Sequence, residues 1–319
     1  MSAPASTPPP ATPAIARGAP AASPLLVAIA PAIFLLFWSG GYAAGKVGLG
    51  YTGPFTLLAV RYGLVLLILL PLVLVMRPTL PRAPAEWVHL AVVGFLIQGV
   101  YFALGYIALA TTLSSAAVAL ILSLQPILVA IIAPRIAGER VGAWGWIGLG
   151  LGLGGAALVI LARAAVEALP LAGVLAAIGA LTGITLGTLY EKRFGVSQHP
   201  VTANAVQYVT GLAVAFPLAW ALEDHAVTWS VPFALALAYL IVCNSLIAMT
   251  LLLMMIRRGE VSRVSALFFL VPPMAAVIGW LLLGEEMPPL AWVGLALAAA
   301  GVALATRADR LLQPRPAGD

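Results

Sequence analysis

The chain has 319 residues, of which 62% are hydrophobic and only 8% are charged. Since a water-soluble domain carries about 25% charged residues, this composition excludes a soluble globular protein and predicts that lipid surrounds most of the chain. The formal net charge of +5 is then a topology signal and calls for no nucleic-acid partner. The single cysteine, Cys243, lies in an apolar run, and no Cys/His cluster suggests a metal. We therefore expect neither metal nor cofactor.

Residues 1–24 precede the first apolar run and are rich in Pro, Ala, Ser and Thr. Such a composition cannot bury a core, and it predicts a disordered tail. The segment is a poor signal peptide because Pro20 and Pro24 separate Arg17 from the apolar run. That run is also long enough to span a membrane, and more such runs follow it.

Ten apolar segments follow, separated by short polar breaks. Each is near the roughly 20 residues that a helix needs to cross the hydrocarbon core of a bilayer. We therefore predict an all-α integral membrane protein with ten transmembrane helices and a cytoplasmic C-terminal tail over 307–319. The predicted spans cover 25–46, 54–76, 87–110, 113–133, 142–162, 171–191, 201–222, 231–256, 261–283 and 289–306.

The basic residues predict the orientation of these spans. If the N-terminus is cytoplasmic, thirteen basic residues lie in cytoplasmic segments, and only Lys46 and Arg163 lie in segments on the other side. This bias places both termini in the cytoplasm and the protein in the inner membrane. Seven of the eight tryptophans lie near span ends or in short loops, as in an interfacial aromatic belt, whereas Trp38 lies in the middle of a span.

The two halves of the chain repeat each other. A shift of 146 residues, without gaps, superimposes residues that are rarely matched by chance. The repeats, 25–165 and 171–306, each hold five predicted spans, and because five is odd the second repeat is inverted in the membrane. Inverted repeats are typical of secondary transporters, with the substrate near the midplane between the halves. The matched pairs include Lys46/Lys192, Pro54/Pro200, Tyr62/Tyr208, Pro126/Pro272, Gly138-Glu139/Gly284-Glu285 and Trp146/Trp292.

Several of these features resemble the drug/metabolite transporter superfamily, in its EamA-type ten-helix branch. The resemblance extends over about 25–306 and rests on the early FWSGGYAAGK segment, on Arg61 early in the second span, and on Pro126 and Pro272 with their following Gly-Glu pairs. It implies a transporter, not an enzyme, that exports amino acids, including aromatic ones, or other small metabolites. Its partners would be the small-molecule substrate and the lipid bilayer.

Two glycine patterns imitate phosphate-binding loops. Gly40, Gly45 and Lys46 match GxxxxGK, but Val47 replaces the required Ser or Thr. A GxGxxG match at 150–155 lies inside an apolar span instead of following a soluble strand. We predict packing glycines in both places, and GxxxG spacing, which lets helices approach closely, occurs at Gly148/Gly152 and Gly150/Gly154.

Arg61 is the one charge well inside a predicted span. An arginine at the bilayer centre costs roughly 2.5–3.5 kcal/mol on insertion scales, so we expect it to have a partner or to reach water. Two roles are open at this point. It could hold a substrate carboxylate, or it could bond to backbone carbonyls and serve the structure alone.

The other candidate binding residues are uncharged. Gln207 is the repeat partner of Arg61 and shares one helical face with Asn204, Tyr208 and Gly211. A polar face in lipid should turn toward protein or a cavity, although each such residue could equally make an interhelical contact. The predicted substrate-binding set is Trp38, Tyr42, Arg61, Gln98, Tyr101, Gln207, Tyr208 and Asn244.

Four prolines lie inside predicted spans at repeat-related positions. Each removes a helical hydrogen bond and can kink its helix. They could be static kinks that shape the bundle, but their repeat-related placement favours hinges. These predicted hinges are Pro71, Pro126, Pro217 and Pro272.

The scarcity of charge restricts the substrate. No acidic residue lies deep in a predicted span, which argues against an exporter that exchanges cationic drugs for protons. A single intramembrane arginine argues against a phosphate-rich substrate. A zwitterionic or neutral metabolite fits best, and facilitated diffusion would suffice to move it. The alternatives are a multidrug exporter of the same fold, an intramembrane enzyme, for which no GxSxG or HExxH motif is found, and a non-transporting scaffold.

Overall fold

The computed structural model describes residues 24–111, 118, 121–136, 138, 141–163, 170–195, 199–258, 261–283 and 288–312. These residues form helices and short connections, and no strand occurs among them. The predicted N-terminal tail lies outside them except for its last residue, Pro24, which begins the first helix. Glu139 and Glu285 of the repeated Gly-Glu pairs also lie outside the described residues.

The described helices follow the predicted spans and confirm an all-α membrane protein of two five-helix repeats. Seven helices are long and apolar enough to cross a membrane, and shorter apolar helices stand at the other three predicted spans. The first half consists of α1 (Pro24–Leu49), α2 (Pro54–Met76), α3 (Pro84–Gly94), π-helical η1 (Phe95–Tyr101), α4 (Phe102–Ala110), α6 (Gln125–Ile136) and α7 (Ala143–Arg163). The second consists of α8 (Leu171–Phe194), α9 (Pro200–Leu222), α10 (Val231–Tyr239), π-helical η2 (Leu240–Ala248), α11 (Met249–Arg258), α12 (Val261–Ala266), the 3-10 turn η3 (Leu267–Leu270), α13 (Val271–Leu283) and α14 (Pro289–Leu312).

Helix irregularities recur at equivalent places in the two halves. The 146-residue shift carries η1 onto η2, so each half has a π-helical stretch in its third span. Pro126 and Pro272 each stand in the first turn of a helix that follows an interruption of its span, whereas Pro71 and Pro217 lie inside α2 and α9. π-Helical turns such as those of η1 and η2 are frequent at functional sites.

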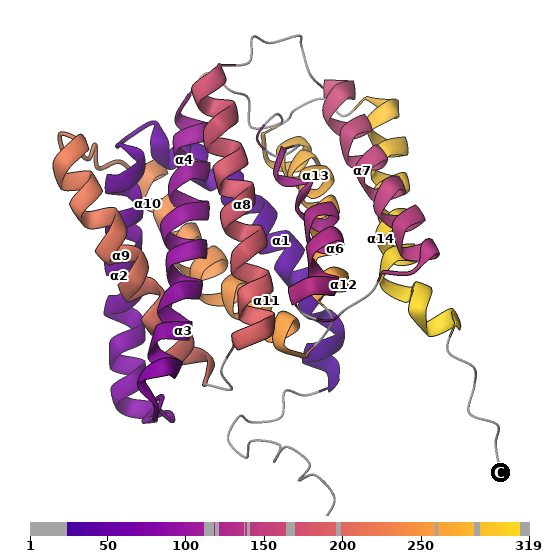
Figure 1. The fold of residues 1–319 in the computed structure, drawn as a ribbon. Coiled ribbons are helices and arrows are strands. Elements are labelled where there is room, and N and C mark those ends of the chain that lie inside the picture. The colour runs from indigo at the N-terminus through magenta and orange to yellow at the C-terminus, as the bar shows by residue number, and fades with distance from the viewer. Residues whose placement is uncertain are drawn as a thin grey trace, which may run out of the picture.

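Helices α7 and α14 pack along each other at one side of the bundle (Figure 1). The contact depends on glycine, because a β-carbon at Gly148 would lie 2.5 Å from the backbone nitrogen of Ala305, and one at Gly301 of α14 would overlap the backbone nitrogen of Gly152. A β-carbon at Gly152 itself would lie 2.6 Å from the Phe269 ring of η3. The predicted packing role is therefore confirmed for Gly148/Gly152. It is wrong for Gly150/Gly154, where a β-carbon would meet open space.

The distribution of tryptophan agrees with the predicted aromatic belt. The seven tryptophans near helix ends are between 41% and 70% exposed, whereas Trp38 is only 1% exposed. The outward face of α2 is also apolar, with Leu67, Leu74 and Val75 all more than half exposed. These exposed side chains form the surface that contacts lipid, and α1 carries Trp38 into the protein core.

At one end of the bundle a carboxylate joins the two halves. Glu223, at the C-terminal end of α9, accepts hydrogen bonds from the backbone nitrogens of Phe55 (2.8 Å) and Thr56 (2.7 Å) in the first turn of α2. Backbone nitrogens in the first turn of a helix lack intrahelical partners and carry the positive end of the helix dipole. Glu223 therefore caps a helix of the other half.

At the opposite end, a buried carboxylate pairs with an arginine. Glu191 lies in the last turn of α8 and is 1% exposed. Its carboxylate accepts a hydrogen bond from Nε of Arg257 at 2.5 Å. Helix α11 and its Arg257 cover this carboxylate.

Candidate functional site

A pocket lies where α1, α4 and the two π-helical segments meet. Its empty space, counted together with the part that is open to solvent, is about 370 Å³. One face of α1 lines it with Trp38, Gly41 and Tyr42, and Asn244 lines it from η2 in the other half. The lining residues are Trp38, Gly41, Tyr42, Tyr101, Phe102, Gly105, Tyr106, Leu109, Leu122 and Asn244.

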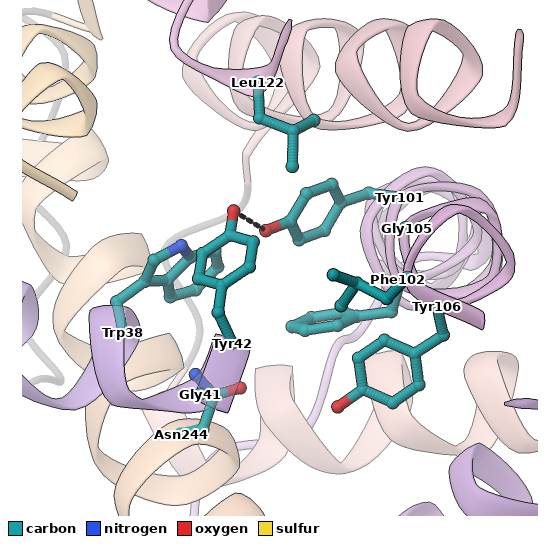
Figure 2. A pocket seen from close by; sticks show the side chains of 10 residues that line it. Trp38, Gly41, Tyr42, Tyr101, Phe102, Gly105, Tyr106, Leu122 and Asn244 are labelled. Atoms are coloured by element: carbon teal, nitrogen blue, oxygen red, sulfur yellow. Dashed lines mark hydrogen bonds between the residues drawn. The ribbon is translucent and has the colours of Figure 1, made fainter. Parts of the chain in front are cut away.

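Aromatic rings form most of the pocket wall (Figure 2). Trp38 stacks on Tyr101 at a centroid distance of 6.0 Å and an interplanar angle of 13°. The hydroxyls of Tyr42 and Tyr101 form a hydrogen bond of 3.3 Å across the pocket. The indole Nε1 of Trp38 is buried and has no hydrogen-bond partner among the described residues. The pocket wall thus consists of apolar ring faces with a few polar atoms, such as the hydroxyls of Tyr42 and Tyr101.

Glycines of α1 make room for two polar side chains of this pocket. A β-carbon at Gly41 would overlap the side-chain nitrogen of Asn244, and one at Gly45 would lie 3.3 Å from the Tyr106 ring. Gly41 and Gly45 are one helical turn apart and so share a face. The predicted packing role is thus confirmed for Gly45, and Gly41 serves packing as well.

Arg61 lies behind the pocket and does not line it. It is fully buried in α2. Nε donates to Oγ of Ser245 (2.8 Å), Nη1 donates to the hydroxyl of Tyr106 (3.0 Å), and Nη2 donates to Oδ1 of Asn244 (2.6 Å). The guanidinium also lies 4.5 Å from the centroid of the Phe102 ring, within the range of a cation–π interaction.

Two neighbours of Arg61, Tyr106 and Asn244, are also pocket residues. Figure 2 shows the side-chain oxygen of Asn244 and the hydroxyl of Tyr106 turned toward each other from opposite sides. The positive charge is therefore separated from the pocket by one layer of polar side chains. Arg61 joins the halves, because Asn244 and Ser245 belong to the second repeat.

The structure divides the predicted binding residues into two groups. Trp38, Tyr42, Tyr101 and Asn244 line the pocket, whereas Arg61, Gln98, Gln207 and Tyr208 do not. Tyr208 donates from its hydroxyl to the backbone oxygen of Ser245 (3.1 Å), and its ring lies 5.4 Å from that of Tyr62.

The two glutamines lie in the packed interface between α9 and η1. Both are fully buried, and their amide atoms make no hydrogen bond of good geometry with the described residues, with the Gln98 amide lying near the Tyr208 hydroxyl. Close packing explains their burial, because a β-carbon at Gly94 would lie 2.7 Å from Cα of Gln207, and one at Gly211 would lie 2.6 Å from Cβ of Gln98. The polar face of α9 is thus turned toward protein, as predicted, but not toward the pocket.

Tyr106 and Phe102 are the main pocket residues that were not predicted. Both follow η1, and they are four residues apart, so they share a face of α4. A polar hydroxyl at Tyr106, within an apolar span, was the available signal. The π-helical turn before it rotates this face relative to Gln98, and that rotation cannot be derived from the sequence pattern.

Comparisons with known proteins agree with this architecture. The model of the EamA-like transporter family matches residues 23–161 and, a second time, residues 171–307. The uncharacterized transporter YvbV of Bacillus subtilis is 26% identical over 274 residues, which cover 86% of this chain and 89% of the relative. The uncharacterized transporter sll0355 of Synechocystis is 27% identical over 308 residues, which cover 90% of each chain. A solved crystal structure covers 92% of this chain and 100% of its own, with a TM-score of 0.76 at 21% identity, and thus shares the fold.

Proposed function

We propose, from the premise that the chain belongs to the EamA-like transporter family, that it exports small metabolites, and amino acids in particular, through the pocket between its two halves. The observation that carries the proposal is the lining of this pocket. Stacked aromatic rings face uncharged polar groups, with one buried cation behind them. Ligand pockets are commonly apolar with a few placed polar groups, and this combination suits an apolar or aromatic side chain that carries a polar end.

Alternating access is the mechanism that we propose for this transport. The pocket combines α1 and α4 of one half with Asn244 of the other, so a movement of the halves would change its walls. The equivalent interruptions before Pro126 and Pro272 provide matched places for bending, and Pro71 and Pro217 provide two more inside α2 and α9. The basic residues predict that the protein lies in the inner membrane with both termini in the cytoplasm. The substrate would then be released on the side of the membrane opposite the cytoplasm.

A panel of radiolabelled amino acids in proteoliposomes tests the proposal. We expect counterflow of phenylalanine and related amino acids above the level of protein-free liposomes, with little dependence on an imposed pH gradient. Uptake of a cationic dye driven by a pH gradient, without amino-acid counterflow, would favour a multidrug exporter instead. Protein that moved no amino acid, dye or sugar would contradict transport of these substrates altogether.

A further inference from the structure

A buried cation beside the pocket has only neutral hydrogen-bond partners. Arg61 is fully buried, and its three bonded partners in the described part of the chain are two side-chain hydroxyls and one amide. A buried charge is costly unless an opposite charge or several hydrogen bonds compensate it. Arg61 makes such hydrogen bonds, but within the described residues no opposite charge compensates its guanidinium.

Tyr106 can pass the effect of this charge into the pocket. A guanidinium can only donate hydrogen bonds, so the oxygen of Tyr106 accepts from Nη1 at 3.0 Å. The hydroxyl proton of Tyr106 is therefore left to donate to another acceptor. Because hydrogen bonds in a chain polarise one another, the bond from Arg61 makes this hydroxyl a stronger donor toward the pocket that it lines.

Asn244 has the same relation to Arg61. The atom that faces Nη2 must be the amide oxygen, because the guanidinium cannot accept, and this fixes the amide nitrogen on the other side. The Nδ2 group has two hydrogens, and its contact with the backbone oxygen of Phe37 is long, at 3.5 Å. Nδ2 is therefore also available to donate within the pocket.

We propose that the pocket binds the carboxylate of its substrate through the hydroxyl of Tyr106 and Nδ2 of Asn244, with Arg61 as the uncontacted positive charge behind them. The indole Nε1 of Trp38 lies in the same pocket beside the Tyr42 hydroxyl and makes no hydrogen bond of good geometry with the described residues, so it is a further donor near the proposed site. The inference rests on the proposed function, since it identifies the polar end of the transported metabolite. It also replaces direct contact between Arg61 and the substrate by an indirect, positioning role.

The first test compares phenylalanine with phenylalaninamide, which keeps the ring and the amine but lacks the carboxylate. Both are applied as competitors of phenylalanine counterflow in proteoliposomes. Tyr106→Phe should reduce the preference for phenylalanine over the amide by about tenfold, the usual value of a hydrogen bond to a charged group. Tyr62→Phe is the matched control, because it removes a buried hydroxyl that bonds to the backbone oxygen of Gln98 and does not line the pocket. The Tyr62→Phe variant should keep the wild-type preference for phenylalanine over the amide.

The second test covers the case in which Tyr106→Phe fails to fold. Asn244→Asp keeps the size of the side chain and the acceptor for Arg61, but it places a negative charge beside the guanidinium. The variant should fold, lose phenylalanine counterflow by about tenfold or more, and accept phenylalaninamide at least as well as the wild type. A gain for the amide cannot result from misfolding.

The outcomes separate the inference from the function on which it rests. If the wild type moves no amino acid, the proposed function fails. If it moves phenylalanine but both variants keep the wild-type preference for the carboxylate, only the inference fails. If replacing chloride by methanesulfonate abolishes transport of phenylalanine and its amide alike, the donors serve a free inorganic anion, and the assignment to the substrate carboxylate is overturned.

Discussion

The two repeats place different chemistry at equivalent positions beside their π-helical segments. Arg61 of the first repeat bonds to Asn244 of the second. The 146-residue shift relates Arg61 to Gln207 and Asn244 to Gln98. The first pair is charged and bonded, and the second is neutral, with amide atoms that lack partners among the described residues. The comparison teaches that equivalent positions in one fold can hold either a bonded, charged pair or a neutral pair.

The same asymmetry extends to the residues that line the pocket. The 146-residue shift replaces the pocket aromatics Trp38, Tyr42 and Tyr101 by Ile184, Thr188 and Ile247. At this equivalent position the amide nitrogen of Gln125 donates to the hydroxyls of Thr188 (3.3 Å) and Ser265 (3.2 Å). Thr188 is thus hydrogen-bonded to Gln125, whereas its repeat partner Tyr42 lines the pocket.

The largest expected effect comes from making the two sides alike. Arg61→Gln introduces the residue of the second repeat and removes a buried charge next to the pocket. We expect phenylalanine counterflow to fall by at least tenfold, corresponding to about 1.4 kcal/mol or more, with the protein still extracted as a monodisperse species. Gln207→Asn is the control at the equivalent position, and a similar loss in that variant would contradict the asymmetry.

A substitution on α1 should have the next largest effect. Gly41→Ala places a β-carbon where Nδ2 of Asn244 lies, so Asn244 must move away from Arg61 and the pocket. We expect severalfold weaker transport and a loss of stability of about 1–3 kcal/mol from overpacking. Gly63→Ala in α2 is the control, because a β-carbon there meets nothing within 4 Å. Thermal unfolding midpoints and counterflow rates of both variants check this, and equal behaviour of the two would contradict it.

The cap between the halves should contribute less. Glu223→Gln weakens the carboxylate cap on the first turn of α2, and we expect a loss of about 0.5–2 kcal/mol in stability. Asp224→Asn removes the same charge from the adjacent residue, whose carboxylate bonds only locally to the backbone nitrogen of Ala226 among its described contacts. If both variants lowered the unfolding midpoint equally, the loss would reflect net charge, and the proposed cap would be wrong.

The smallest effect is expected on the neutral side of the comparison. The double variant Gln98→Leu with Gln207→Leu replaces two buried amides by apolar side chains of similar size. Because neither amide has a described partner to lose, stability should change by less than about 1 kcal/mol or increase, and transport should persist. Asn204→Leu, which removes a bond to Thr250, should be the more destabilising change. Loss of transport in the double variant would restore Gln98 and Gln207 as binding residues.

Composition and periodicity were sufficient to predict the membrane architecture. Apolar runs of span length predicted the helices, and matches such as Tyr62/Tyr208 predicted two repeats, because both depend on local sequence alone. The position of Trp38 in mid-span correctly separated it from the interfacial tryptophans. The burial of Glu191 was missed because it depends on Arg257 of another helix.

The composition of the site could be predicted only in part. Trp38, Tyr42, Tyr101 and Asn244 share the pocket, but Gln98 and Gln207 face a neighbouring helix. A helical pattern shows which residues share a face, and it does not show which element that face meets. The π-helical turn of η1 adds a rotation that depends on tertiary packing, and for this reason Tyr106 escaped prediction.

The position of a bound substrate carboxylate tests the central claim most directly. A structure of the wild-type protein with 4-bromophenylalanine would locate the ring by the anomalous signal of bromine and the carboxylate by its connection to that ring. We predict the carboxylate within hydrogen-bond distance of the Tyr106 hydroxyl and of Nδ2 of Asn244, with no atom in direct contact with Arg61. A carboxylate bound between Gln98 and Gln207, or directly on the Arg61 guanidinium, would contradict this account.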